Sequence, residues 1–334
     1  MPTAYPEALG FRSFARANAA ASLDEQRALV AGGTQGIGAG IALRYALAGA
    51  EVWLIGRSRE RGDAVVQKLQ QASQEYQRRS GKAAHTSGAK EHVFFSADLA
   101  DAREITRVVE EVRQKAGEKG IDWIVQTQGG PPTGTFRENA AGGYEQRFAV
   151  QCLSRFGIAA QLAAAGVVKA GIILVAAPGS GGNKAVDVED LDFAKARQTG
   201  EWKSGVFGLL AQGARQSSVL DSVSQTLAER HPALRIAHVF PGLCKTNALA
   251  NAGGPQVVQW LADTFGGIVM NKPGVGGFAE VPFYLAATAE GRQLMQSGQA
   301  NLFSPGLRRY ELSPNVRELS VREKIWERLS AALR

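Results

Sequence analysis

The stretch Ala31-Gly-Gly-Thr-Gln-Gly-Ile-Gly38 carries the strongest structural signal in this sequence. It follows a short apolar run, residues 28–31, and opens a segment of helical periodicity, residues 37–48. Glycines in such a turn let the backbone pass close to a pyrophosphate, whose charge then lies at a helix N-terminus. A glycine-rich turn alone is weak support, but here it lies between a strand and a helix. The residues predicted to bind a dinucleotide are Gly32, Thr34, Gln35, Gly36, Ile37 and Gly38.

The rest of the chain alternates short apolar runs with longer segments of helical periodicity. The runs predicted to be strands are 28–31, 52–55, 92–96, 123–126, 172–176, 235–240 and 299–303. The predicted helices are 37–48, 59–76, 102–116, 144–162 and 206–230. Most strand segments are continuously apolar, which is typical of parallel strands buried on both faces. The pattern predicts an α/β fold, a doubly wound parallel Rossmann sheet of seven strands in a single domain.

Within the 334 residues we expect an N-terminal arm (1–26), the Rossmann domain (27–305) and a C-terminal helical extension (306–334). The polar segment 73–91 is predicted to be an exposed loop. Segment 179–203 lies where a catalytic loop is expected, and its acidic residues Asp187, Glu189, Asp190 and Asp192 are predicted to be solvated. A lid is expected near 247–277, where Val257, Trp260 and Phe265 recur at helical spacing. That apolar stripe could instead be simple packing, or a contact with a membrane surface or a partner.

Composition and charge argue against a nucleic-acid-binding protein and against a membrane-spanning one. The net charge of +7 is spread along the chain, so nucleic-acid binding is not expected. No apolar run reaches the length of a membrane span. The two cysteines form no disulfide framework and indicate a reducing, cytoplasmic location. Residues 11–19 loosely resemble a transit peptide, but their neighbouring acidic residues favour an ordered arm.

The second predicted strand ends in Gly56-Arg57-Ser58. A dinucleotide fold that selects NAD places a carboxylate there, on the ribose 2′-hydroxyl. A guanidinium can instead pair with a 2′-phosphate. Arg57 and Ser58 therefore predict NADP(H) as the cofactor, although Arg57 could also be an ordinary surface charge.

Several motifs in order resemble those of the short-chain dehydrogenase/reductase family over about residues 26–305. The glycine turn matches T-G-x-x-x-G-I-G, Gly129-Gly130 matches the end of N-N-A-G, and Pro241-Gly242-Leu-Cys-Lys-Thr246 matches P-G-x-x-x-T beside the nicotinamide. Asp98 and Leu99 are similar to the turn that contacts adenine. Segments such as Ser154-Arg-Phe resemble a divergent fungal branch.

The resemblance implies a catalytic Ser, Tyr and Lys, with an Asn that supports a water relay. The Asn position falls on Gln151, and the Ser position on an alanine in Ala176-Ala177-Pro178, with Ser180 the nearest hydroxyl. No tyrosine lies between residues 144 and 284, and segment 206–230 has no lysine. A cofactor-facing His238 or a reactive Cys244 is conceivable; a packing role is favoured for His238, and Cys244 lacks a base. No metal-ligand spacing is present.

Three functions remain open. The first is an NADP(H)-dependent oxidoreductase acting on a small, apolar carbonyl or alcohol, with its proton supplied by Ser180, by a water held by Gln151, or by the substrate. The second is a catalytically silent NADP-binding protein, and the third a non-redox enzyme that reuses the pocket. Segment 217–230 lies where family members often pair, so a homodimer is possible.

Overall fold

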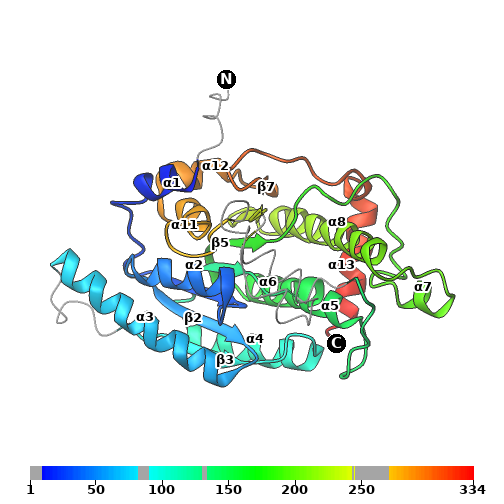
Figure 1. Cartoon of the computed structure of the whole chain (residues 1–334), viewed down its shortest axis with the longest axis horizontal. Helices are drawn as coiled ribbons and strands as arrows, with labels where there is room; N and C mark the ends of the chain where they lie inside the picture. The colour runs from blue at the N-terminus through cyan, green and yellow to red at the C-terminus, as the bar shows by residue number, and fades with distance from the viewer. Residues whose placement is uncertain (1–9, 82–89, 130–133, 243, 245–270) are drawn as a thin grey trace.

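The computed structural model describes residues 10–81, 90–129, 134–242, 244 and 271–334, and the structural statements below concern these residues. Seven parallel strands form one sheet in the order β3-β2-β1-β4-β5-β6-β7 (Figure 1). The strands are β1 (Arg27–Ala31), β2 (Glu51–Gly56), β3 (Val93–Ser96), β4 (Ile121–Gln126), β5 (Val168–Val175), β6 (Arg235–Val239) and β7 (Asn301–Phe303). The predicted doubly wound parallel sheet is confirmed.

Helices cover both faces of this sheet. The main ones are α1 (Phe11–Ala17), α2 (Gly36–Ala46), α3 (Arg59–Ser80), α4 (Ala102–Ala116), α6 (Ser154–Ala164), α8 (Val206–Arg230), α11 (Glu280–Ala287) and α13 (Leu319–Ala331). Shorter elements are α5 (Gln146–Phe148), the π-helical turn η1 (Ala149–Leu153), α7 (Ala194–Gln198), α12 (Ala289–Leu294) and the 3₁₀ turn η2 (Pro314–Val316). One apolar cluster joins α4, α6, α8 and α13 to one face of the sheet, and a second joins α1, α2, α3 and α11 to the other.

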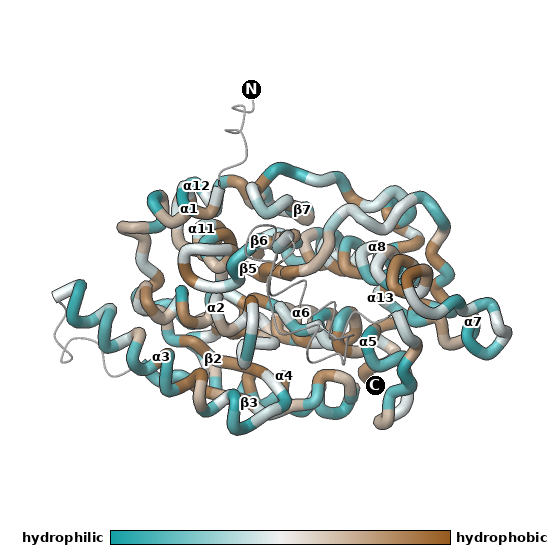
Figure 2. Tube along the Cα trace, in the orientation of Figure 1, coloured by the Kyte–Doolittle hydropathy of each residue, from teal (hydrophilic) through white to brown (hydrophobic). Residues whose placement is uncertain are grey.

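The hydrophobic residues concentrate in the strands. Every residue of β1 and β2 is buried, as expected for parallel strands covered on both sides. Figure 2 shows this as a brown centre, with the teal, polar residues along α3 and α7 at the periphery. In the described residues no helix is long and apolar enough to cross a bilayer.

Three sequence predictions were wrong in detail. The helix expected over 144–162 is interrupted by the π-helical turn η1, which inserts an extra residue per turn before α6 begins. The expected loop at 73–91 begins as helix, because α3 continues to Ser80 and buries Ser73. The acidic run is not fully solvated: Asp190 and Asp192 are buried and accept hydrogen bonds from backbone N–H groups.

Both ends of the described chain pack against the domain. Phe14 of α1 is fully buried and lies edge-on to Tyr284 at a centroid distance of 5.3 Å. At the other end, α13 packs along α8, and Trp326 meets Phe156 of α6 at 4.8 Å. Residues 10–26 and 306–334 therefore contribute to the two apolar clusters.

Candidate active site and cofactor crevice

The strand order reverses between β1 and β4, and ligands of such sheets bind in the crevice at the carboxyl ends of those strands. The glycine turn lies at this point. A Cβ on Gly38 would lie 2.3 Å from the carbonyl oxygen of Gly32, so only glycine lets α2 approach β1 this closely. Gly36 adopts a left-handed φ of 54°, which a side chain would strain. The side chain of the N-cap residue Gln35 makes no capping hydrogen bond to the first turn of α2, which leaves the N–H groups of that turn for a phosphate.

Arginines gather at the end of β2, beside the glycine turn. Arg57 is exposed there, and the Ser58 hydroxyl accepts a hydrogen bond from Arg61 N at 3.3 Å to begin α3. The Arg61 guanidinium donates to Gln35 Oε1 at 3.0 Å and so joins α3 to the glycine turn. The sequence has no carboxylate at the end of β2, and the guanidinium of Arg57 is of the kind that can pair with a phosphate.

The turn after β3 presents one side chain and buries the next. Asp98 is exposed, and its Oδ1 accepts a hydrogen bond from Ala100 N at 3.1 Å. Leu99 is only 4% exposed and belongs to the apolar cluster around α4. An adenine ring at this turn would therefore meet the Asp98 side chain, while the Leu99 side chain serves as an anchor in the core.

Gln151 lies against the end of β4. Its Oε1 is 2.8 Å from the position that a Cβ on Gly129 would take, so the amide lies directly over the crevice floor. The π-helical turn η1 contains Gln151, and such turns re-aim side chains relative to a regular helix. The structure thus brings two predicted site residues, Gln151 and Gly129, into contact.

Asn271, which lies outside the Pro241–Thr246 motif, stabilises the turn after β6. Asn271 Nδ2 donates to the carbonyl oxygen of Pro241 at 3.0 Å, and a Cβ on Gly242 would collide with that same amide. Burial raises the pKa of the Cys244 thiol to about 11, so this cysteine is protonated near neutral pH and is not a reactive thiolate. Thr246 and the expected lid residues Val257, Trp260 and Phe265 lie outside the described residues.

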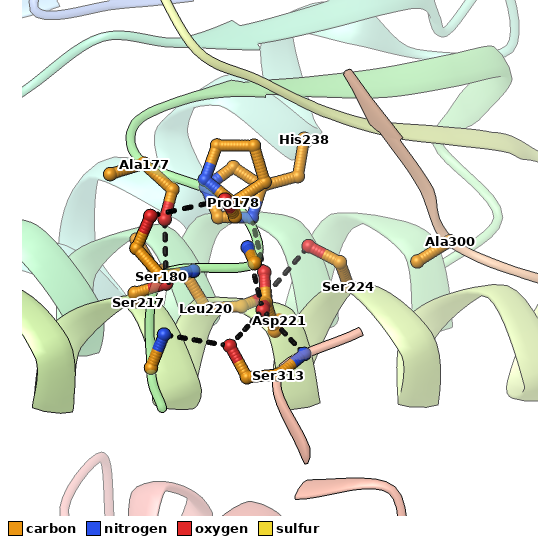
Figure 3. A network of polar contacts seen from close by, with 12 residues as sticks. Ala177, Pro178, Ser180, Ser217, Leu220, Asp221, Ser224, His238, Ala300 and Ser313 are labelled. Carbon is orange, nitrogen blue, oxygen red and sulfur yellow. Dashed lines mark hydrogen bonds and ion pairs between the residues drawn. The ribbon is translucent and has the colours of Figure 1, made fainter. Parts of the chain in front are cut away.

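Ser180 lies in the loop that follows β5, where Figure 3 shows it beside Ser217. Its N–H donates to Ser217 Oγ at 2.9 Å, and its hydroxyl donates to the carbonyl oxygen of Pro178 at 3.3 Å. Ser217 Oγ in turn donates to the Ala177 carbonyl at 2.6 Å. Among the described residues Ser180 makes no hydrogen bond with Gln151, so the two candidates remain separate sites for a proton.

A fully buried carboxylate, that of Asp221 on α8, organises this loop (Figure 3). Its Oδ2 accepts from Gly179 N at 3.0 Å, and from the backbone N–H and hydroxyl of Ser313 at 3.1 and 2.6 Å. Its Oδ1 lies 2.9 Å from Nδ1 of His238, which is itself fully buried. His238 therefore packs inside the core, as the sequence favoured, and does not face the cofactor crevice.

The sequence interpretation missed two residues that organise the crevice, Asp221 and Arg155. Each is the only charged residue within five positions on either side in its helical stretch, and that pattern was the available signal. Both side chains are at most 1% exposed. In the described part of the chain no group of His, Cys, Asp and Glu residues could hold a metal ion.

Comparisons with known proteins agree with this geometry. Residues 26–186 match the family described as short chain dehydrogenase. An oxidoreductase of Emericella nidulans (Oxidoreductase AN1596) is 26% identical over 229 residues, which span 67% of this chain and 60% of that protein. The chain thus covers less than two thirds of the relative's length.

Solved structures share the fold at low sequence identity. A short-chain type dehydrogenase/reductase from Mycobacterium ulcerans has a TM-score of 0.56 at 17% identity, over 86% of this chain and 92% of that one. The RhlG/NADP active-site complex of Pseudomonas aeruginosa has a TM-score of 0.53 at 18% identity, over 86% and 97% of the two chains.

Proposed function

We propose that this chain, whose residues 26–186 match the short chain dehydrogenase family, is an NADP(H)-dependent oxidoreductase acting on a small, apolar carbonyl or alcohol. The observation that carries the proposal is the glycine turn with Arg57 beside it, where a carboxylate would select NAD. The NADP complex of the structurally similar Pseudomonas protein adds support for this choice of nucleotide.

The crevice residues divide between the parts of the nucleotide. The first turn of α2 would hold the pyrophosphate, Arg57 and Ser58 the 2′-phosphate, and Asp98 the adenine side. Pro241 and Gly242 would border the nicotinamide, with Thr246 completing that motif. When bound, NADPH supplies a hydride to the substrate carbon. The chain's own residues then need to place the carbonyl oxygen and deliver a proton to it.

The proton source makes this an atypical member of the family. Helix α8 contains neither tyrosine nor lysine, and Ala176 and Ala177 follow β5 where the family has a serine. Gln151 over Gly129 would hold a water at the crevice floor, and Ser180 is the nearest hydroxyl on the β5 loop. The lack of a positioned general acid typically lowers the rate by about 10²–10⁴-fold, which proximity to bound NADPH partly offsets.

A second candidate function is a catalytically silent NADP-binding protein. The combined absence of tyrosine and lysine from α8 and of serine after β5 favours it. A non-redox enzyme that reuses the pocket is a third. Consumption of NADPH with any member of a panel of small ketones and aldehydes would exclude the silent protein. Product formation without added nucleotide would identify the non-redox enzyme.

The deciding experiment is a titration of the purified protein with NADPH and NADH, followed by quenching of tryptophan fluorescence. We expect NADPH to bind more tightly. Arg57→Ala should weaken NADPH binding about 10- to 100-fold, as expected for one lost charge-assisted phosphate contact, and leave NADH unchanged. Arg78→Ala, near the far end of α3, is the matched control and should alter neither affinity. No binding of either nucleotide would overturn the proposal.

We extend the proposal to the setting of the protein: a cytoplasmic enzyme that binds no nucleic acid. A homodimer formed through α8 is also proposed, and burial within the chain limits which part of α8 could form the interface. Residues 216–224 of α8 are buried within the chain, and α13 packs along this helix. A pair would therefore use the exposed first turns of α8, where Val206, Phe207 and Leu210 are each at least 65% exposed.

A further inference from the structure

Arg155 on α6 is fully enclosed at the carboxyl ends of β4 and β5, with 1% of its surface exposed. Its Nε and Nη2 donate to the carbonyl oxygen of Gln128 at 3.2 and 2.7 Å. Its Nη1 donates to the carbonyl oxygen of Val175 at 2.9 Å. One guanidinium therefore holds the ends of two central strands together.

This buried cation has no counter-ion among the described residues. Each hydrogen bond that its guanidinium donates ends on a backbone carbonyl, and no described carboxylate forms an ion pair with it. The neighbouring Cys152 thiol is neutral, because burial raises its pKa. Burial lowers the pKa of Arg155 to about 10, so the side chain remains charged at neutral pH. A buried charge normally has a paired anion, since its desolvation is costly.

The charge lies next to the cofactor crevice. Gln128, its carbonyl partner, precedes Gly129 at the crevice floor. On the other side, the glycine turn rests directly on Gln128, because a Cβ on Gly32 would lie 2.6 Å from Gln128 N. Gln151, one helical turn before Arg155, covers the same floor. Val175, the other carbonyl partner of Arg155, pairs with Val239 at the end of β6, so the charge also lies near the Pro241-Gly242 turn that would border the nicotinamide.

We propose that Arg155 is a positioning residue whose buried charge makes the crevice prefer the reduced nucleotide, so that the protein loads NADPH and releases NADP⁺. This inference rests on the proposed NADP(H)-dependent function. The two redox forms share their phosphates and differ in the ring, which is neutral in NADPH and cationic in NADP⁺. A nearby cation therefore raises the energy of bound NADP⁺ alone. Two unit charges about 10 Å apart change a binding constant roughly tenfold at an effective dielectric constant near 20.

The test compares the dissociation constants of NADPH and NADP⁺ by tryptophan quenching in four proteins. In the wild type NADPH should bind more tightly. Arg155→Met removes the charge and should lower the ratio of the NADP⁺ constant to the NADPH constant about tenfold. Arg155→Lys keeps the charge and should retain the ratio. Arg57→Ala, which acts on a phosphate common to both forms, should weaken both to a similar extent and leave the ratio unchanged.

Three results would overturn the inference. The first is a wild-type ratio at or below one, which needs no variant and so holds even if Arg155→Met does not fold. The second is an unchanged ratio in a folded Arg155→Met protein that binds both forms, which would leave Arg155 a purely structural link between β4 and β5. The third is failure of the wild type to bind either form, which would also remove the proposed function.

Discussion

The hydroxyl of Ser313 donates a 2.6 Å hydrogen bond to Asp221 Oδ2, although the two residues are 92 positions apart in the chain. The same hydroxyl accepts a hydrogen bond from Gly181 N at 2.9 Å. Ser313 therefore joins three segments: the loop after β5, helix α8 and the segment that leads to η2. The contact explains how the loop that carries Ser180 is held over the core without a regular secondary structure.

Replacement of Ser313 by alanine should destabilise the protein. The change removes a hydrogen bond to a charged group and leaves Gly181 N buried without its acceptor. We expect a loss of about 1.5–3 kcal/mol in the free energy of unfolding, measured by urea titration. Ser80→Ala, at the exposed end of α3, should change it by less than about 0.5 kcal/mol. Equal effects of the two substitutions would show that the Asp221 contact does not stabilise the loop.

Replacement by alanine should abolish NADPH binding at Gly38 and should stabilise the protein at Gly213. In Gly38→Ala the new methyl would lie 2.4 Å from Thr127 Oγ1 as well as against Gly32, so the turn must move and NADPH binding should be lost. In Gly213→Ala the methyl meets no atom within 4 Å, and the helix should gain about 0.5–1 kcal/mol. Thermal unfolding and NADPH titration of both variants measure the two effects. Normal NADPH affinity in Gly38→Ala would contradict the close packing of the turn.

The C-terminal helix should be essential for stability. Leu329 of α13 is fully buried in the cluster with α6 and α8. Leu329→Ala should cost about 2–5 kcal/mol, because it removes buried methyl groups and leaves a cavity. Glu327→Ala, two residues earlier on the exposed side of α13, should have little effect. Urea denaturation of both variants provides the measurement, and a loss below about 1 kcal/mol in Leu329→Ala would mean that α13 docks only loosely.

Stability should fall as the pH drops below about 6.5, in part through His92. Its Nδ1 accepts the Val52 N–H at 3.1 Å, and its Nε2 lies 2.8 Å from Ser73 Oγ, so the ring is neutral in the folded protein. Burial lowers the pKa of His92, so the unfolded chain binds its proton first and acid favours unfolding. The contribution is fully present above the unfolded pKa, and it is lost as the pH falls from there through the lower folded-state pKa.

Unfolding free energies at pH 5 and pH 7 test this assignment. The fall between the two pH values should be smaller in His92→Gln than in the wild type, by about 1 kcal/mol. His231, whose pKa is also lowered by burial but which is more exposed, supplies the control substitution His231→Gln. If His92→Gln keeps the full wild-type fall, other groups account for the acid sensitivity.

Local patterns in the sequence were sufficient to predict the sheet and the glycine turn. Short, mostly apolar runs predicted all seven strands, because parallel strands buried on both faces favour apolar residues at nearly every position. The glycine turn was predicted from its spacing together with the strand before it and the helix after it, and close approach of α2 to β1 depends on the absence of a Cβ at positions 32 and 38. Both signals are contained within a few consecutive residues.

The contacts around Arg155 and Asp221 needed the folded chain. Arg155 bonds to carbonyls 20 and 27 positions away, and Asp221 to a hydroxyl 92 positions away. Each of these polar groups is stable in the core only because the fold brings the matching donors and acceptors to it. No local propensity encodes such a pairing. For the same reason the helix break at η1 and the burial of Asp190 and Asp192 escaped prediction, since packing and long-range hydrogen bonds override local polarity.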